Sequence, residues 1–169
     1  MVVDVSSILK ESGGRIEISG EIPAPGEEFS GVRFTEPIRI SGSITNNGKT
    51  LKLSAHADCR ASTECARCLK EIEIVFDFDF SEFLAQGEEQ IDDEVYMFEH
   101  DSVDLTGIVI DNLSMNISGK YLCGEDCKGL CPKCGADLNE TECGCDTETI
   151  DPRWAALADI MKGSSDASD

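Results

Sequence analysis

The chain has 169 residues, and its 34 acidic side chains against 14 lysines and arginines give a formal net charge of −20. Hydrophobic residues make up 40% and charged residues 28%, which is typical of a folded protein and excludes general disorder. The negative charge disfavours a general binder of nucleic acid backbones, because phosphates would be repelled. No apolar stretch approaches the ~20 residues of a membrane-spanning helix, and no secretory signal is recognisable, so we expect a cytoplasmic protein with no membrane segment.

The first half of the chain predicts β-strands. Ile16 and Ile18 alternate with polar residues and indicate a short strand before the breaker sequence 23–26. Residues 37–59 alternate again on both sides of the sequence 46–49, which contains an Asn-Gly pair. Because this pair tolerates the positive φ of a tight turn, we expect a β-hairpin over 37–59.

A second long alternation follows. Isoleucines and phenylalanines occupy every second position over 72–80, and acidic residues occupy most of the positions between them. This pattern predicts an antiparallel strand with one buried and one solvated, acidic face. Residues 86–94 are polar and predict a loop, and residues 95–98 predict a short returning strand.

Two helices are expected in the second half. Asp104 is a typical N-cap, and the apolar residues that follow it fit one helical face to about Ile117. Asp151 and Pro152 begin a second, short amphipathic helix that contains Trp154. The tail 163–169 is expected to be disordered.

Cysteines dominate the chemistry. Without a secretory signal the compartment is reducing, where stable disulfides are rare, and nine cysteines suit a complete set of disulfides poorly. Eight of them fall in closely spaced pairs, and two such pairs can complete a tetrahedral zinc site. The pairs are Cys65/Cys68, Cys123/Cys127, Cys131/Cys134 and Cys143/Cys145.

We expect two Zn²⁺ ions per chain. The loop between Cys134 and Cys143 is short, so the last two pairs, Cys131/Cys134 and Cys143/Cys145, form one predicted site. The pairs Cys65/Cys68 and Cys123/Cys127 form the second predicted site. For the six C-terminal cysteines the alternatives are redox chemistry and iron–sulfur ligation, and Cys65/Cys68 could instead be a redox couple or two unrelated buried thiols. Cys59 remains and is expected to be a small buried residue at a strand end.

Catalytic signatures are absent. The two histidines, His56 and His100, stand in unrelated contexts, and neither the His-x-Glu motif of zinc deaminases nor the His-Glu-x-x-His motif of zinc proteases occurs. A closed site of four thiolates has no open position for a substrate, so the predicted zinc is structural and the protein is not expected to be an enzyme.

The cysteine sequences, taken with their surroundings, resemble the YceD-like family of large-subunit ribosomal RNA accumulation proteins. The resemblance rests on Cys65-Ala-Arg-Cys68 before the acidic strand, on Asp104-Leu105, on the continuous sequence 123–139, and on Asp151-Pro152-Arg153. It covers residues 30–162 and implies a small, non-enzymatic bacterial or plastid protein that is needed for normal levels of large-subunit ribosomal RNA.

The expected fold is α+β: an antiparallel sheet that could close into a barrel, one packed helix, a cysteine-rich zinc module and a short C-terminal helix. The expected boundaries are 1–120 for the β-rich core, 121–147 for the zinc module, 148–162 for the C-terminal helix and 163–169 for the tail. No lysine or arginine occurs between Lys70 and Lys120. We therefore expect the partner to be a basic large-subunit ribosomal protein or a pre-ribosomal particle, with ribosomal RNA contacted near Lys128 and Lys133.

Two other functions remain open from the sequence. A thiol–disulfide redox protein would use Cys65 and Cys68, which requires a depressed thiol pKa. A zinc-ribbon module that binds proteins of the transcription machinery would use the same metal sites for a different partner.

Overall fold

The structure is a computed structural model, and it describes residues 1–26, 28–87 and 95–146. The chain divides into two compact units, Met1–Cys123 and Gly124–Asp169. The predicted C-terminal helix, the predicted tail and most of the predicted loop 86–94 lie outside the described residues. No helix in the described part of the chain is long and apolar enough to cross a membrane.

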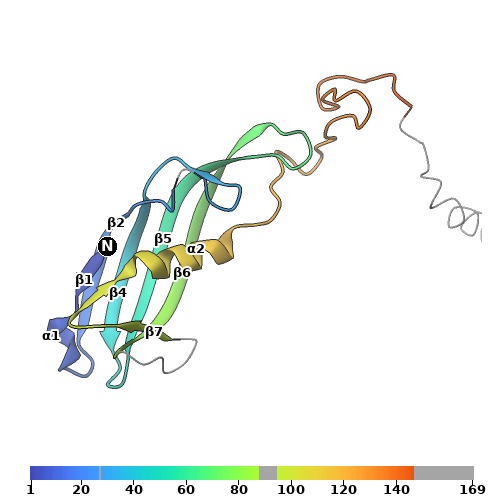
Figure 1. The fold of residues 1–169 in the computed structure, drawn as a ribbon. Coiled ribbons are helices and arrows are strands. Elements are labelled where there is room, and N and C mark those ends of the chain that lie inside the picture. Colours follow the sequence, from blue (N-terminus) through green and yellow to red (C-terminus); the bar gives the residue numbers. More distant parts are fainter. Residues whose placement is uncertain (27, 88–94, 147–169) are drawn as a thin grey trace, which may run out of the picture. The chain divides into compact units, whose positions relative to one another are not determined.

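The first unit is a sheet crossed by one helix (Figure 1). Its strands are β1 (Val2–Asp4), β2 (Arg15–Ile22), β3 (Arg33–Phe34), β4 (Ile38–Asn46), β5 (Leu51–Glu64), β6 (Glu71–Gln86), β7 (Val95–Phe98) and β8 (Ser102–Asp104), and its helices are α1 (Ser6–Leu9) and α2 (Leu105–Asn116). The main sheet has the order β2-β4-β5-β6-β7, with β3 paired to β5, while β1 and β8 form a separate pair. This architecture is α+β and mostly sheet.

The predicted hairpin is present. β4 pairs antiparallel with β5, with Ile44 opposite Leu53. Gly48 adopts φ +93° in the turn, which glycine reaches without strain. Both polar groups of the buried Asn46 side chain are hydrogen-bonded here. Its amide donates to the Ile8 carbonyl at 2.6 Å, and its oxygen accepts from the Gly48 N–H at 2.7 Å.

Two expectations about the sheet are wrong. The sheet is not a closed barrel: within the described residues β2 pairs only with β4, and β7 only with β6, so both edges stay open. The sheet is also not wholly antiparallel, because β7 pairs parallel with the last four residues of β6. In this pairing Val95 lies opposite Phe83 and Phe98 opposite Gln86.

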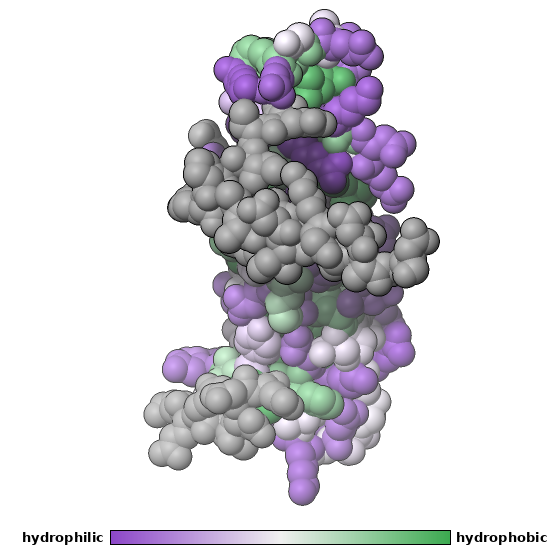
Figure 2. Space-filling model, turned by 90° about the vertical axis from the view of Figure 1, so that its right-hand side faces the viewer, coloured by the Kyte–Doolittle hydropathy of each residue, from purple (hydrophilic) through white to green (hydrophobic). Residues whose placement is uncertain are grey.

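Helix α2 covers the open face of the sheet in place of a barrel closure. It begins after Asp104, whose side chain accepts from the Thr106 N–H at 3.0 Å, as an N-cap does. Ile108, Val109 and Leu113 on its inner side join the apolar residues of the strands in one core. The opposite face of β5 and β6 is solvated and mostly polar, as the alternation predicts, with Val75 and Phe83 as exposed apolar side chains on β6. Figure 2 shows small apolar areas between mostly hydrophilic side chains on the visible surface.

Candidate metal centres

Two Cys-x2-Cys turns share the same backbone hydrogen bonds. In the first, the Leu69 N–H donates to the Cys65 carbonyl at 2.9 Å and the Cys65 N–H donates to the Lys70 carbonyl at 2.8 Å. In the second, Gly135 donates to Cys131 and Cys131 donates to Ala136, both at 2.8 Å. Each turn is therefore a knuckle that brings its two cysteines together, although the two sequences share little besides the cysteines.

The residue after the second cysteine of each knuckle is left-handed. Gly135 has φ +73°, which costs glycine nothing, whereas Leu69 has φ +61° and is 59% exposed. A left-handed conformation costs an ordinary residue roughly 1–2 kcal/mol, so the fold must impose it at Leu69. The first knuckle has no glycine in its sequence, and only the cysteine spacing could have indicated its shape.

The second unit holds one complete set of cysteines. The sulfur atoms of Cys131, Cys134, Cys143 and Cys145 all lie within 4.8 Å of one another. Zinc–sulfur bonds of ~2.3 Å in a tetrahedron place sulfur atoms about 3.8 Å apart, so this set fits one ion. The pairing of the last two cysteine pairs agrees with the sequence prediction, and the identity of the ion stays a prediction.

The thiol groups of this set differ in acidity. Backbone N–H groups of Cys134 and Lys133 stabilise the Cys131 thiolate and lower its pKa to about 6. A hydrogen bond with the Cys134 side chain raises the pKa of Cys145 to about 12. Four thiolates cannot coexist at this separation without a cation, and a divalent ion would displace the remaining protons.

The first unit brings three cysteines of the other predicted site together. Cys65, Cys68 and Cys123 have sulfur atoms within 4.8 Å of one another, and the sulfur atoms of Cys68 and Cys123 are 3.6 Å apart. The Ala66 N–H donates to the Tyr121 carbonyl at 2.9 Å, which holds the segment before Cys123 against the knuckle. Backbone N–H groups, of Cys68 above all, lower the pKa of Cys65 to about 6. These three thiols form a second group that could hold a metal ion.

Cys127, the fourth predicted ligand of that site, belongs to the second unit. The Asn139 side-chain amide donates to the Cys127 sulfur at 3.5 Å, and its carbonyl oxygen accepts from the Lys128 N–H at 2.8 Å. N–H donors of this kind orient thiolate ligands and stabilise their charge. The sequence does not single out Asn139, because its contact with Cys127 spans eleven intervening residues.

Cys59 does not lie at a strand end as expected. β5 continues to Glu64, so Cys59 is in the middle of the strand, 1% exposed and part of the apolar core. Burial raises the pKa of its thiol to about 11. The side chain is therefore a packing residue of the core, and its exclusion from the metal sites stays a prediction.

Comparisons with known proteins agree with the cysteine pattern. Residues 53–161, more than half of the chain, match the family described as large ribosomal RNA subunit accumulation protein YceD. All eight predicted ligands lie within this range. No solved structure matches the chain.

The relatives come from bacteria and a plant. An uncharacterized protein of Mycobacterium tuberculosis is 26% identical over 174 residues, which cover 98% of this chain and 84% of the relative. The uncharacterized protein YlbN of Bacillus subtilis is 27% identical over 136 residues, or 79% of each chain. A chloroplast protein of Arabidopsis thaliana, named large ribosomal RNA subunit accumulation protein YCED homolog 1, is 32% identical over 60 residues, which cover 36% of this chain and 19% of the relative.

Proposed function

The chain belongs to the YceD family, and from this membership we propose that it acts in the biogenesis of the large ribosomal subunit without catalysing a reaction. The family is named for the accumulation of large-subunit ribosomal RNA, and the chloroplast relative carries the same name. The family match is the observation that carries the proposal. Ribosome assembly would place the protein in the cytoplasm of a bacterial cell.

Two structural zinc ions are the second part of the proposal. The donor set of each group is sulfur, which suits Zn²⁺, and each group contains a knuckle whose N–H groups stabilise thiolates. Cys127 would complete the group of Cys65, Cys68 and Cys123, since only three residues separate it from Cys123. Both sites would then be closed, which suits a scaffold.

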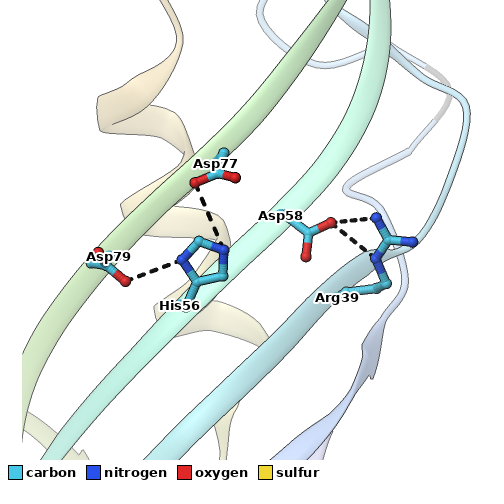
Figure 3. Close-up of polar contacts among 5 residues, drawn as sticks. All are labelled: Arg39, His56, Asp58, Asp77 and Asp79. Carbon is cyan, nitrogen blue, oxygen red and sulfur yellow. Dashed lines mark hydrogen bonds and ion pairs between the residues drawn. The ribbon is translucent and has the colours of Figure 1, made fainter.

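A basic protein is the partner that the charge of the chain favours. On the solvated face of the sheet, Arg39 pairs with Asp58, and His56 lies 3.1 Å from Asp79 and 3.7 Å from Asp77 (Figure 3). The Arg39 guanidinium offsets part of the acidic charge at the centre of that face. No lysine or arginine lies between Lys70 and Lys120, so the remaining acidic groups of that segment would attract a basic large-subunit protein. Lys128 and Lys133 of the cysteine-rich unit would be available for ribosomal RNA.

The redox alternative finds little support. A thiolate that attacks a disulfide must be accessible, whereas Cys65 is 0% and Cys68 7% exposed. The low pKa of Cys65 serves a metal ligand equally well.

Depletion of the protein in its own organism, combined with crosslinking and mass spectrometry, tests the proposal. We expect less large-subunit ribosomal RNA relative to small-subunit RNA, and crosslinks to proteins of pre-ribosomal particles. Crosslinks to RNA polymerase in place of ribosomal proteins would favour the transcription module. A metal-free protein whose cysteines all react rapidly with a thiol reagent would favour redox chemistry.

A further inference from the structure

A pocket of about 540 Å³ opens between β7, β8 and α2. It lies within the first unit and is separate from both groups of cysteines. The residues that line it come from β7, β8, α2 and their connections within the stretch 95–111, together with Leu84 at the end of β6.

The floor of the pocket is apolar. Phe98, Val103 and Ile108 are buried beneath it, and the half-buried side chains of Tyr96 and Met97 form one wall. Such a floor is suited to an aliphatic or aromatic side chain, because that side chain would lose its contact with water on entering.

The rim of the pocket is acidic. Glu99, Asp104 and Asp111 are exposed at its mouth, and no lysine, arginine or histidine lines it. Asp104 pairs with the N-terminal ammonium group at 3.2 Å, and the His100 ring lies 4.0 Å from Glu99, so the proposal uses Glu99 and Asp111. The Tyr96 hydroxyl donates to Asp111 at 3.2 Å. Burial, together with the charges of Asp111 and Glu82, raises the pKa of Tyr96 to about 12, so the phenol stays neutral.

Gly107 leaves the helix side of the pocket open. It lies inside α2 without a positive φ, and a Cβ at this position would meet no atom within 4 Å. A glycine inside a helix is less favourable than alanine by about 1 kcal/mol. Neither a turn nor close packing requires glycine here. The absence of a side chain at Gly107 lets a second chain approach the helix backbone beside the pocket.

We propose that this pocket is the docking site for a basic protein segment, which inserts one apolar side chain between Tyr96 and Gly107 while its lysines or arginines pair with Glu99 and Asp111. The inference rests on the proposed function, because it assigns a surface to the basic ribosomal partner. Charge complementarity selects this occupant: an acidic peptide or a nucleic acid backbone would be repelled by the rim. A neutral apolar ligand would make no use of the charges of Glu99 and Asp111 and is an outcome that the test must separate.

Peptide titrations of the isotope-labelled, zinc-loaded full chain, followed by NMR, test the proposal. The probes are a lysine-rich peptide with one central leucine, the same peptide with alanine at the centre, and a glutamate-rich peptide with the leucine. We expect shifts at Tyr96, Met97 and Gly107 with the first peptide, affinity at least about tenfold weaker with the second, and no binding with the third.

Matched variants locate the site. Gly107→Leu places a side chain in the open space beside α2, on a helix that tolerates leucine, and should weaken the affinity for the first peptide at least about tenfold. Gly119→Leu adds the same side chain at another glycine with open space around it and should leave this affinity unchanged. Asp111→Asn with Glu99→Gln should weaken binding and remove most of its salt dependence, whereas Glu17→Gln with Glu21→Gln on β2 should not.

The outcomes separate this inference from the proposed function. The docking proposal would be overturned if Gly107→Leu left peptide binding unchanged, or if the leucine and alanine peptides bound with equal affinity. Equal binding of a fourth probe, an uncharged peptide with the same central leucine, would also overturn it. If the pocket fails while the chain still crosslinks to pre-ribosomal proteins, the proposed function stands. If the peptide binds as expected but the crosslinks are absent, the docking site stands and its ribosomal assignment falls.

Discussion

Replacement of one thiolate ligand should unfold the cysteine-rich unit and leave the sheet folded. In the described part of that unit, residues 124–146, the regular structure is one bridge between Leu130 and Asp137, and no aliphatic or aromatic side chain is buried. Hydrophobic burial therefore contributes little to its stability. The variant that tests this is Cys131→Ser in the full chain.

The magnitude follows from the source of stability. Structural zinc contributes an apparent binding free energy of roughly 10–16 kcal/mol in small modules, and this free energy is also folding free energy. A unit with almost no apolar core cannot replace it, so the loss of one ligand should disorder the unit completely. The sheet keeps its own core around Leu53, Leu84 and Leu113 and should unfold as before.

Zinc quantification and hydrogen exchange of single segments provide the assay. In the zinc-loaded protein the N–H groups of Gly135, Leu138 and Thr141 are hydrogen-bonded and should be protected. Cys131→Ser should bind one zinc ion fewer and lose this protection. The control Cys59→Ser should keep all its zinc and lower the stability of the sheet by about 1–3 kcal/mol, because it places a hydroxyl in the core. Protection of these three amides in Cys131→Ser, or in protein stripped of metal, would refute the reasoning.

Three further substitutions have expected outcomes in urea denaturation. Asp104→Ala removes the cap of α2 and should cost about 1 kcal/mol at pH 7. Since the hydrogen bonds from Thr106 lower the pKa of Asp104 to about 2, this difference should be complete above pH ~4 and decline as the pH falls through about 2. A difference as large at pH 2 as at pH 7 would contradict the assignment. Gly42→Ala should destabilise by about 3 kcal/mol or more, because the new Cβ would lie 2.5 Å from the Ala55 Cα; a neutral effect would contradict this packing. Gly107→Ala should stabilise by about 1 kcal/mol, and a loss would show that the space beside α2 is filled.

Local sequence patterns were sufficient for much of the fold and for half of the candidate site. Alternation over 37–59 and 72–80 predicted β4, β5 and β6, and Asp104 predicted the start of α2, because the side-chain periods of strands and helices depend on the nearest residues alone. The grouping of Cys131, Cys134, Cys143 and Cys145 also followed from short spacing, since a brief loop leaves the chain few ways to place two pairs apart.

The sequence by itself thus determined the long strands, helix α2, the close pairs of cysteines and the acidic character of this protein. Only the tertiary structure decided that the sheet stays open, that β7 runs parallel to β6, that Leu69 is forced into a left-handed conformation, and that Asn139 reaches Cys127. The pocket bounded by Tyr96 and Gly107 is also a feature that only the tertiary structure decides. Each of these features depends on which distant segments pack together, and that choice is made by the burial of the whole core rather than by the preference of any single stretch of chain.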